Sequence, residues 1–198
     1  MQLCPAGFNI RCMKQVCAVV LDRDGVINFD SPDYILTPEQ WQPIPGSLEA
    51  IARLTKAGIA VAIASNQSAL GRGTLDDATF EAIQTKMMQA ITDAGGEIVH
   101  MAYCPHAPED DCACRKPMPG MLYETLQTLG LSGRAGEVLF IGDSLRDVEA
   151  GVAAGMIPVL VQSGYGDAEA IHQKADSLHP GIAVYPDLAA AVNAILEP

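Results

Sequence analysis

The sequence has few positive charges and no long apolar run. Its 198 residues include 12 Lys and Arg against 24 Asp and Glu, a formal net charge of −12. Because this excess of negative charge repels a polyanion, it disfavours nucleic-acid binding. No apolar stretch reaches the ~20 residues that span a bilayer, and the first residues lack the apolar core of a signal peptide. We therefore expect a cytoplasmic protein that binds neither nucleic acid nor membrane.

The sequence also lacks repeats, low-complexity tracts and any linker long enough to divide it. Its composition, 49% hydrophobic and 18% charged, is sufficient for a full core. We expect residues 1–12 to be an N-terminal extension without a clear pattern. Residues 13–198 are expected to form a single domain with an inserted loop at 104–114. We expect this domain to be a monomer.

Short apolar segments alternate with helical patterns along the rest of the chain. Strands are expected at 16–22, 59–65, 97–103, 137–143, 157–162 and 181–184. Helices are expected at 47–58, 74–95, 119–130, 145–155 and 186–197, with Thr74 and Asp77 resembling a capping pair. Strands that are apolar throughout and alternate with helices indicate a parallel sheet covered on both faces. The predicted fold is therefore α/β, with a Rossmann-like parallel sheet.

Polar side chains lie at the ends of four of the predicted strands. In such sheets ligands bind beyond the carboxyl ends of the strands, which lie along one edge. The residues expected to meet there are Asp22 and Asp24, Ser65 and Asn66, the 104–116 segment, and Asp143 with Asp147.

The pair Asp22 and Asp24 suits phosphoryl transfer, because one carboxylate can attack phosphorus while the other protonates the leaving oxygen. Asp143 adds an oxygen ligand of the kind that Mg²⁺ prefers. An isolated pair of this kind more often caps a strand. Gly25 and the segment GDSLRD on another strand favour the catalytic interpretation. The segment SNQS (65–68) can hold phosphoryl oxygens through a hydroxyl and backbone N–H groups, although alone it is typical of an ordinary turn.

The segment CPHAPEDDCACRKP (104–117) combines soft ligands with two cations. Its spacing C-x-H-x₅-C-x-C supplies a complete tetrahedral zinc shell from Cys104, His106, Cys112 and Cys114. Four protein ligands leave no open position, so such a zinc would be structural. A redox pair is the rival, but Cys112-x-Cys114 lacks the two-residue spacing of that motif. Free buried cysteines are unexpected in so polar a segment.

Two cations follow the last cysteine directly. Lys116 can neutralise charge on a transferring phosphoryl group, and Arg115 can hold a second, non-reacting phosphate with two N–H donors. A solvated surface pair is the ordinary alternative. Trp41 either packs in the core or contacts a ligand, and the sequence does not decide between these.

Four segments resemble the motifs of the haloacid dehalogenase superfamily of phosphatases, in the order that this family uses. They are VVLDRDGVIN, ASNQSALGRG, CPHAPEDDCACRKPMPGM and FIGDSLRDVEAG, and the resemblance covers about residues 16–196. The zinc loop makes the chain similar to the branch that removes the C7 phosphate of a heptose bisphosphate. The histidinol-phosphate phosphatases share that loop and are the alternative. A non-catalytic zinc-stabilised module and a polynucleotide 3′-phosphatase are less favoured, the latter because a basic stripe is absent.

The resemblance implies a role for each residue at the sheet edge. Asp22 would be the nucleophile that becomes an aspartyl-phosphate, and Asp24 the general acid and then base. Mg²⁺ would be held by the Asp22 carboxylate, the Asp24 backbone carbonyl and Asp143. Ser65 and Lys116 would hold the phosphoryl group, while Asp147 would orient Lys116 or a metal-bound water. The residues expected to contact substrate are Asp30, Ser31, Pro32, Asp33, Ser65, Asn66, Gln67, Ser68, Arg115, Lys116 and Ser144.

Two features depart from the family pattern. Position 65 is Ser where the family often has Thr, which keeps the hydroxyl. The zinc loop is short, with five residues between His106 and Cys112. Because such loops take the place of a large cap domain, we expect a more open site and broader substrate acceptance.

Overall fold

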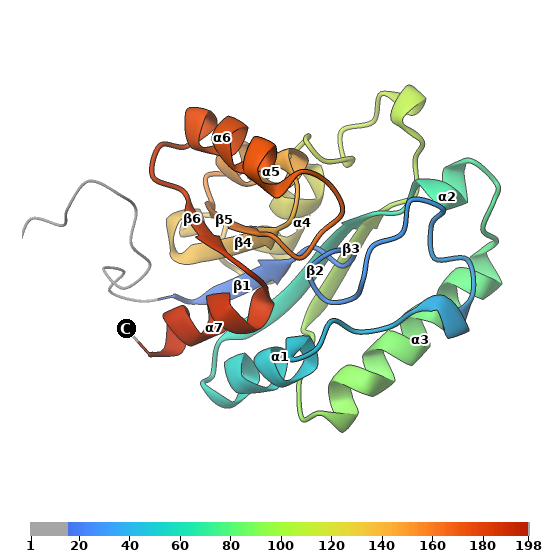
Figure 1. Cartoon of the computed structure of the whole chain (residues 1–198), viewed down its shortest axis with the longest axis horizontal. Coiled ribbons are helices and arrows are strands. Elements are labelled where there is room, and N and C mark those ends of the chain that lie inside the picture. The colour runs from blue at the N-terminus through green and yellow to red at the C-terminus, as the bar shows by residue number, and fades with distance from the viewer. Residues whose placement is uncertain (1–15, 198) are drawn as a thin grey trace, which may run out of the picture.

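The computed structural model describes residues 16–197, so the predicted extension at 1–12 lies outside the described residues. A parallel sheet runs through the middle of the molecule (Figure 1), with six strands in the order β3-β2-β1-β4-β5-β6. The strands are β1 (Ala18–Leu21), β2 (Ala60–Asn66), β3 (His100–Cys104), β4 (Val138–Gly142), β5 (Ile157–Val161) and β6 (Ala183–Tyr185). All neighbouring pairs are parallel. The predicted α/β fold with a parallel sheet is confirmed.

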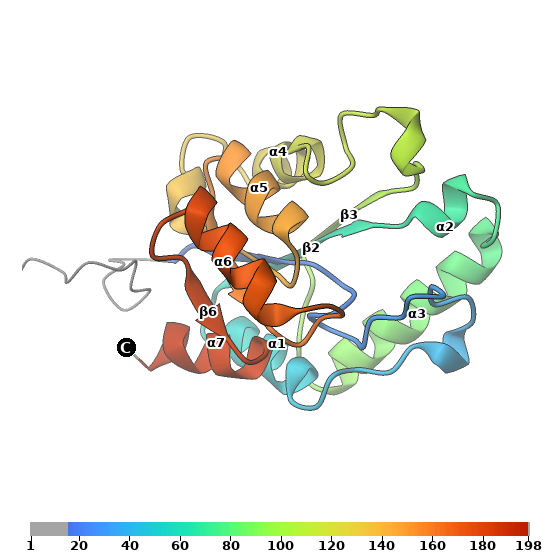
Figure 2. The same ribbon diagram turned by 45° about the horizontal axis from the view of Figure 1, so that its top comes forward.

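Helices cover both faces of this sheet, as the two views show (Figure 1 and Figure 2). One face carries α1 (Ser47–Lys56), α3 (Asp77–Asp93) and α7 (Leu188–Leu196). The other carries α4 (Gly120–Thr128) and α5 (Leu145–Ala153), with α6 (Ala168–Leu178) beside α5. The short α2 (Ser68–Gly71) follows β2 directly. None of the helices within residues 16–197 is long and apolar enough to cross a membrane.

The central strand β1 is buried on both faces of the sheet, which is why its sequence is a continuous apolar run. Val19 and Leu21 pack into the core beneath α1, α3 and α7, while Ala18 and Val20 pack toward α4 and α5. Successive side chains point to opposite faces of a sheet, so a strand covered on both faces needs apolar residues at every position. All four are fully buried.

One helix boundary and one whole helix differ from the sequence prediction. The N-cap of α3 is Asp76, whose side chain accepts from the backbone N–H of Thr79 at 2.7 Å. The predicted capping pair of Thr74 and Asp77 is therefore wrong, and the Thr74 hydroxyl donates to the Ala69 carbonyl at 3.1 Å instead. The helix α6 is not predicted from the sequence pattern. Only Ala175 of this helix is fully buried, so its apolar periodicity is weak.

The strand order reverses direction beside β1, which pairs with β2 on one side and β4 on the other. Such a switch point leaves a crevice beyond the strand ends, because the chain leaves neighbouring strands toward opposite sides of the sheet. Asp22 follows β1 and Asp143 follows β4, so both carboxylates lie at this crevice.

Trp41 packs in the core and supports the loop that follows β1. Its side chain is 1% exposed, and its indole Nε1 donates to Asn28 Oδ1 at 3.0 Å. The same Asn28 side chain donates from Nδ2 to Asp24 Oδ1 at 2.8 Å. The sequence left open whether Trp41 packs in the core or contacts a ligand, and the structure shows that it packs in the core. Trp41 also helps to position Asp24, because it holds the Asn28 side chain that donates to Asp24.

We expect Trp41→Phe to lower the free energy of unfolding by about 2 kcal/mol or more, measured by urea denaturation. The change removes buried indole volume and leaves Asn28 Oδ1 without its buried donor. Tyr123→Phe is the matched control, because it also removes one donor, here from an exposed hydroxyl that contacts the Ala153 carbonyl at 2.9 Å. Tyr123→Phe should lower the free energy of unfolding by less than about 1 kcal/mol. Equal losses from both variants would contradict the buried hydrogen bond.

Candidate active site

A cavity of about 300 Å³ opens at the switch point, beyond the carboxyl ends of β1, β2 and β4. The structure brings most of the residues predicted from sequence to its walls. Those lining it are Asp22, Asp24, Asp30, Ser31, Ser65, Asn66, Gln67, Ser68, Arg115, Lys116, Asp143, Ser144 and Asp147. Two residues predicted to contact substrate, Pro32 and Asp33, are exposed and do not line the cavity.

A buried lysine joins three segments of the chain at the base of the cavity. Lys116 Nζ lies 2.8 Å from Asp22 Oδ1 and 2.7 Å from Asp147 Oδ1, and its side chain is 2% exposed. It also donates to the Ala64 carbonyl at 3.0 Å. Burial alone would lower the pKa of Lys116, but the two carboxylates outweigh it and raise that pKa. The lysine is therefore a fixed positive charge.

Asp22 and Asp143 carry carboxyl groups that burial makes hard to ionise. Desolvation raises the pKa of Asp22 to about 7, with Asp147 adding to the rise and Lys116 opposing it. Desolvation raises the pKa of Asp143 to about 8, and repulsion from Asp147 and Asp22 adds to it. Glycine is required beside Asp143, because a Cβ at Gly25, where φ is +78°, would lie 2.6 Å from Asp143 Oδ2.

These carboxylates fit a divalent cation. Carboxylate oxygens of Asp22, Asp143 and Asp147 lie within 4.8 Å of one another, and all three residues are buried. Lys116 is the one cation in direct contact with this group within the described chain, which leaves an excess of buried negative charge. Asp147 is already occupied, because its Oδ2 accepts from the Ser144 backbone N–H at 3.0 Å and from the Ser144 hydroxyl at 2.5 Å. Asp22 and Asp143 are thus the carboxylates available to a metal.

Asp24 is held on both of its oxygens by side chains around it. Arg23 makes a two-pronged contact, from Nε to Oδ1 at 3.0 Å and from Nη2 to Oδ2 at 2.9 Å. Asn28 Nδ2 adds a second donor to Oδ1 at 2.8 Å, and Gln67 Nε2 adds one to Oδ2 at 3.0 Å. The carboxylate therefore stands at one wall of the cavity in a fixed orientation.

Asn66 fixes the backbone that carries Lys116. Its Nδ2 donates to the Lys116 carbonyl at 3.1 Å, and its Oδ1 accepts from the Lys116 N–H at 3.0 Å. An amide side chain is suited to this double contact because it offers a donor and an acceptor side by side. The end of β2 and the end of the cysteine loop are thereby joined.

The sequence prediction missed several cations and aromatic residues of the cavity. Arg23, Arg72, Arg146, Tyr34 and Tyr165 also line it. Together with Arg115 and Lys116, the lining holds five of the chain's 12 Lys and Arg but only five of its 24 acidic residues. Their proximity to the motifs was a usable signal, since Arg72 follows the SNQS segment and Arg146 follows GDS. The cavity is thus far less negative than the chain as a whole.

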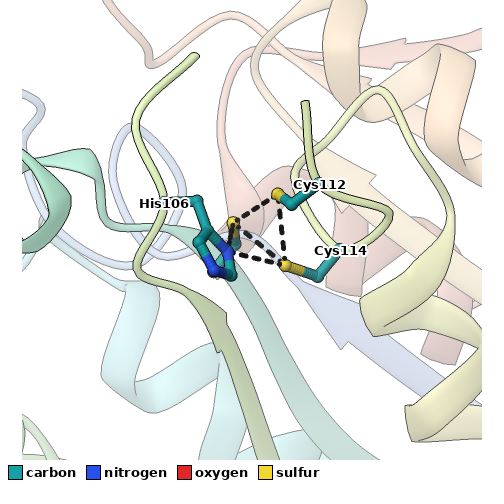
Figure 3. A group of neighbouring side chains, drawn as sticks. His106, Cys112 and Cys114 are labelled. Carbon is teal, nitrogen blue, oxygen red and sulfur yellow. Dashed lines mark hydrogen bonds between the residues drawn. The ribbon is translucent and has the colours of Figure 1, made fainter. Parts of the chain in front are cut away.

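The four soft ligands form a compact group at the end of β3. Figure 3 shows the side chains of His106, Cys112 and Cys114 turned toward one another. His106 Nδ1 lies 3.2 Å from Cys114 Sγ, and Cys104 Sγ lies 3.2 Å from Cys114 Sγ and 3.5 Å from Cys112 Sγ. A tetrahedral zinc with ordinary bond lengths would separate such ligands by roughly 3.5–3.8 Å. The donor set therefore fits zinc, and the shortest separations, at 3.2 Å, lie a few tenths of an ångström below those of a tetrahedral shell.

This loop packs against α2 and reaches the cavity from that side. The Gly71 N–H donates to the Pro105 carbonyl at 2.8 Å, and a Cβ at Gly71 would lie 2.6 Å from the same oxygen. Arg72 Nη2 pairs with Glu109 Oε1 at 3.2 Å, an exposed contact. Arg115 Nη1 donates back to the His106 carbonyl at 3.1 Å. The loop thus holds Arg115 at the rim of the cavity and Lys116 at its base.

We expect the metal-free protein to lose stability as the pH rises from 5 to 8. The pKa values of Asp22 and Asp143 are higher in the folded chain than the ordinary carboxyl value of 3.8. The native state therefore binds more protons than the unfolded state across this window, and ionisation at higher pH opposes folding. Chemical denaturation in EDTA should show the free energy of unfolding falling by roughly 2–4 kcal/mol.

Asp143→Asn is the control for this pH dependence. The amide cannot ionise, so the variant should show a shallower decline between pH 5 and pH 8. Addition of Mg²⁺ at pH 8 should stabilise the wild type more than the variant. A pH dependence that is identical in the two proteins would contradict the origin assigned to it.

Comparisons with known proteins agree with this geometry. The profile of the haloacid dehalogenase-like hydrolase family matches residues 19–155. A Pseudomonas aeruginosa protein named D-glycero-beta-D-manno-heptose-1,7-bisphosphate 7-phosphatase is 46% identical over 181 residues, 90% of this chain and 97% of that protein. A Bordetella bronchiseptica protein of the same name is 45% identical over 181 residues, with the same coverage of both chains.

A solved structure is similar over nearly the whole chain. The crystal structure of D,D-heptose 1,7-bisphosphate phosphatase from B. bronchiseptica, complexed with magnesium and phosphate, has a TM-score of 0.83 at 42% sequence identity. The match covers 91% of this chain and 98% of that one. The matched family region includes Asp22, Ser65, Lys116 and Asp143, which the fold gathers at one cavity. The chain therefore belongs to the haloacid dehalogenase-like hydrolase family.

Proposed function

We propose that this chain is a Mg²⁺-dependent phosphatase that removes the C7 phosphate of D-glycero-D-manno-heptose 1,7-bisphosphate. The observation that carries the proposal is the buried Lys116, in contact with Asp22 and beside Asp143 at the base of a polar cavity. The relatives that carry this substrate in their name are matched over 97% of their length, which supports the same substrate here. Their name specifies the beta anomer, so we propose this anomer as the preferred one.

In the first step an Asp22 carboxylate oxygen attacks the C7 phosphorus, and the bond from phosphorus to the C7 oxygen breaks. The product of this step is an aspartyl-phosphate, and the leaving alkoxide takes a proton from Asp24. Asp22 is prepared for attack because Lys116 and the Arg23 backbone N–H both contact its Oδ1, the latter at 2.7 Å. These two contacts fix the rotation of the carboxylate.

In the second step Asp24 takes a proton from water, which attacks the aspartyl-phosphate. This releases inorganic phosphate, frees the Asp22 carboxylate and returns Asp24 to its protonated form, so the cycle closes with water as the only other reactant. Ser65 would donate its O–H to a phosphoryl oxygen in both steps. Lys116, whose three N–H groups contact Asp22, Asp147 and the Ala64 carbonyl, would hold the phosphoryl group through its positive charge. Both side chains line the cavity and are at most 3% exposed, so these interactions act where water is scarce.

Mg²⁺ would be held by Asp22, Asp143 and the backbone carbonyl of Asp24. When bound, it would neutralise the buried carboxylates and the phosphate charge. The fit rests on the excess of buried negative charge around Lys116. Asp147 serves a different purpose in this proposal, because it pairs with Lys116 and accepts twice from Ser144.

We further propose that Cys104, His106, Cys112 and Cys114 bind a structural Zn²⁺. Burial would raise the pKa of the Cys112 thiol, but a hydrogen bond from the Arg115 backbone and the neighbouring thiols lower it to about 7. A thiolate ligand is thus accessible near neutral pH. The ion would hold the loop that positions Arg115 and Lys116, and a four-ligand shell leaves it no catalytic position.

The second phosphate of the substrate would lie at the mouth of the cavity. Arg72 and Arg146 are exposed and Arg115 is half-buried, and all three line the cavity. Guanidinium groups suit a phosphate that is recognised but not transferred, because they bind two of its oxygens at once. The proposal also takes the enzyme as a cytoplasmic monomer, in which the residues that line the cavity suffice for the reaction.

Phosphate release from purified, metal-replete protein tests the substrate. We expect turnover of the beta heptose bisphosphate to exceed that of the alpha anomer and of histidinol phosphate. Asp22→Asn should reduce this turnover by roughly 10³-fold or more while circular dichroism stays unchanged, since the amide cannot act as nucleophile. Faster release from histidinol phosphate would contradict the sugar substrate, and a fully active Asp22→Asn variant would contradict the mechanism.

Measuring zinc content by inductively coupled plasma mass spectrometry tests whether the cysteine group binds zinc. Cys112→Ser should lose the bound zinc and lower Tm by roughly 5–10 °C, because binding free energy contributes to folding of the loop. Cys17→Ser is the control, since Cys17 lies outside the group and contacts Glu137 at 3.1 Å. Unchanged zinc content in Cys112→Ser would refute the assignment of these ligands.

A further inference from the structure

Gln67 is predicted from sequence to contact substrate, yet its side-chain amide is turned toward other site residues. Nε2 donates to Ser65 Oγ at 2.8 Å and to Asp24 Oδ2 at 3.0 Å. These two contacts use both N–H groups of the amide. Gln67 is 5% exposed, and its backbone N–H donates to the Cys104 carbonyl at 2.8 Å. Its position is therefore fixed by the sheet edge rather than by a ligand.

The contact with Gln67 determines what the Ser65 hydroxyl can do. A hydroxyl has one proton and two lone pairs, and here a lone pair accepts from the amide. The hydroxyl proton is left for another acceptor, and within the described residues no group takes it. Ser65 lines the cavity, so a phosphoryl oxygen bound there would be the acceptor. The amide thus favours the serine as a donor toward the cavity.

The same amide sets the separation between Ser65 and Asp24. Arg23 and Asn28 hold Asp24 from within its own loop, whereas Gln67 reaches it from the end of β2. Gln67 is the residue that contacts both the predicted phosphoryl-binding hydroxyl and the predicted acid/base carboxylate. A carboxylate in its place would present acceptors to Asp24 and repel it.

We propose that Gln67 is a positioning residue that orients the Ser65 hydroxyl toward the transferring phosphoryl group and holds Asp24 at a fixed distance from it. The inference rests on the proposed roles of Ser65 and Asp24. It assigns Gln67 an effect on turnover rather than on substrate affinity, because its polar hydrogens contact the protein. The part of its effect that acts through Ser65 should disappear when that hydroxyl is removed.

The experiment is a double-mutant cycle on the holoenzyme with Ser65→Ala, Gln67→Met and the double variant, using the heptose bisphosphate as substrate. Methionine keeps the length of glutamine and removes both donors. We expect Gln67→Met to lower kcat by roughly 10- to 100-fold with KM within about twofold. In the Ser65→Ala background, Gln67→Met should lower kcat by a factor several-fold smaller, because part of the effect of Gln67 depends on the Ser65 hydroxyl.

Gln84→Met is the matched control, since it removes another buried glutamine amide away from the cavity. Gln84 Nε2 donates to Met101 Sδ at 2.8 Å, and this variant should keep kcat and KM. A rise in KM with unchanged kcat for Gln67→Met, or the same loss with and without the Ser65 hydroxyl, would overturn the inference. Wild-type turnover by Ser65→Ala would instead refute the proposed role of Ser65. Loss in Ser65→Ala without loss in Gln67→Met would refute the positioning role alone.

Discussion

The structure of the site depends on one buried positive charge. Lys116 contacts carboxylates from the end of β1 and from α5, and a backbone carbonyl from β2. Removing a buried cation from such a group leaves several like charges in a medium of low dielectric, which is more costly than losing a surface pair. The loop that carries Lys116 must therefore return to the same place in every folded molecule. Asn66 supports this by holding the Lys116 backbone on both its donor and its acceptor.

This requirement gives the cysteine loop its place in the fold. Residues 105–111 are mostly polar and lie at the surface, so apolar burial contributes little to their order. In our proposal a zinc ion supplies the missing free energy, and Cys114 stands two residues before Lys116 in the sequence. A fixed Cys114 limits the positions open to Arg115 and Lys116. The loop also contacts α2 through Gly71 and Arg72, so the wall of the cavity and its base are connected.

The sequence predicted the strands and the ligands at their ends because both are local patterns. A strand buried on both faces is apolar along its length. Asp22 and Asp143 follow such strands directly, and Ser65 lies at the end of another. The direction of a side chain is not a local property, which is why Asn66 and Gln67 read as ligand contacts although their amides bond to Lys116, Ser65 and Asp24. Arg23 was overlooked for the same reason, since its contact with Asp24 depends on the turn between them. The helix α6 was missed because a helix packed at the edge needs few apolar residues.

The charge of the cavity is compatible with the doubly phosphorylated substrate that we propose, although the chain has a net charge of −12. Cations and carboxylates are equal in number along its walls, and a divalent metal would make the balance positive. The cations are also sorted by depth, with Lys116 buried at the base and Arg72 and Arg146 exposed at the mouth. A phosphate at the base would meet the nucleophile, while a second phosphate would meet guanidinium groups that have no nucleophile beside them. The arrangement therefore favours a bisphosphate that enters the cavity with one phosphate first. The phosphate at the base would be transferred, and the chemically similar phosphate at the mouth would only be bound.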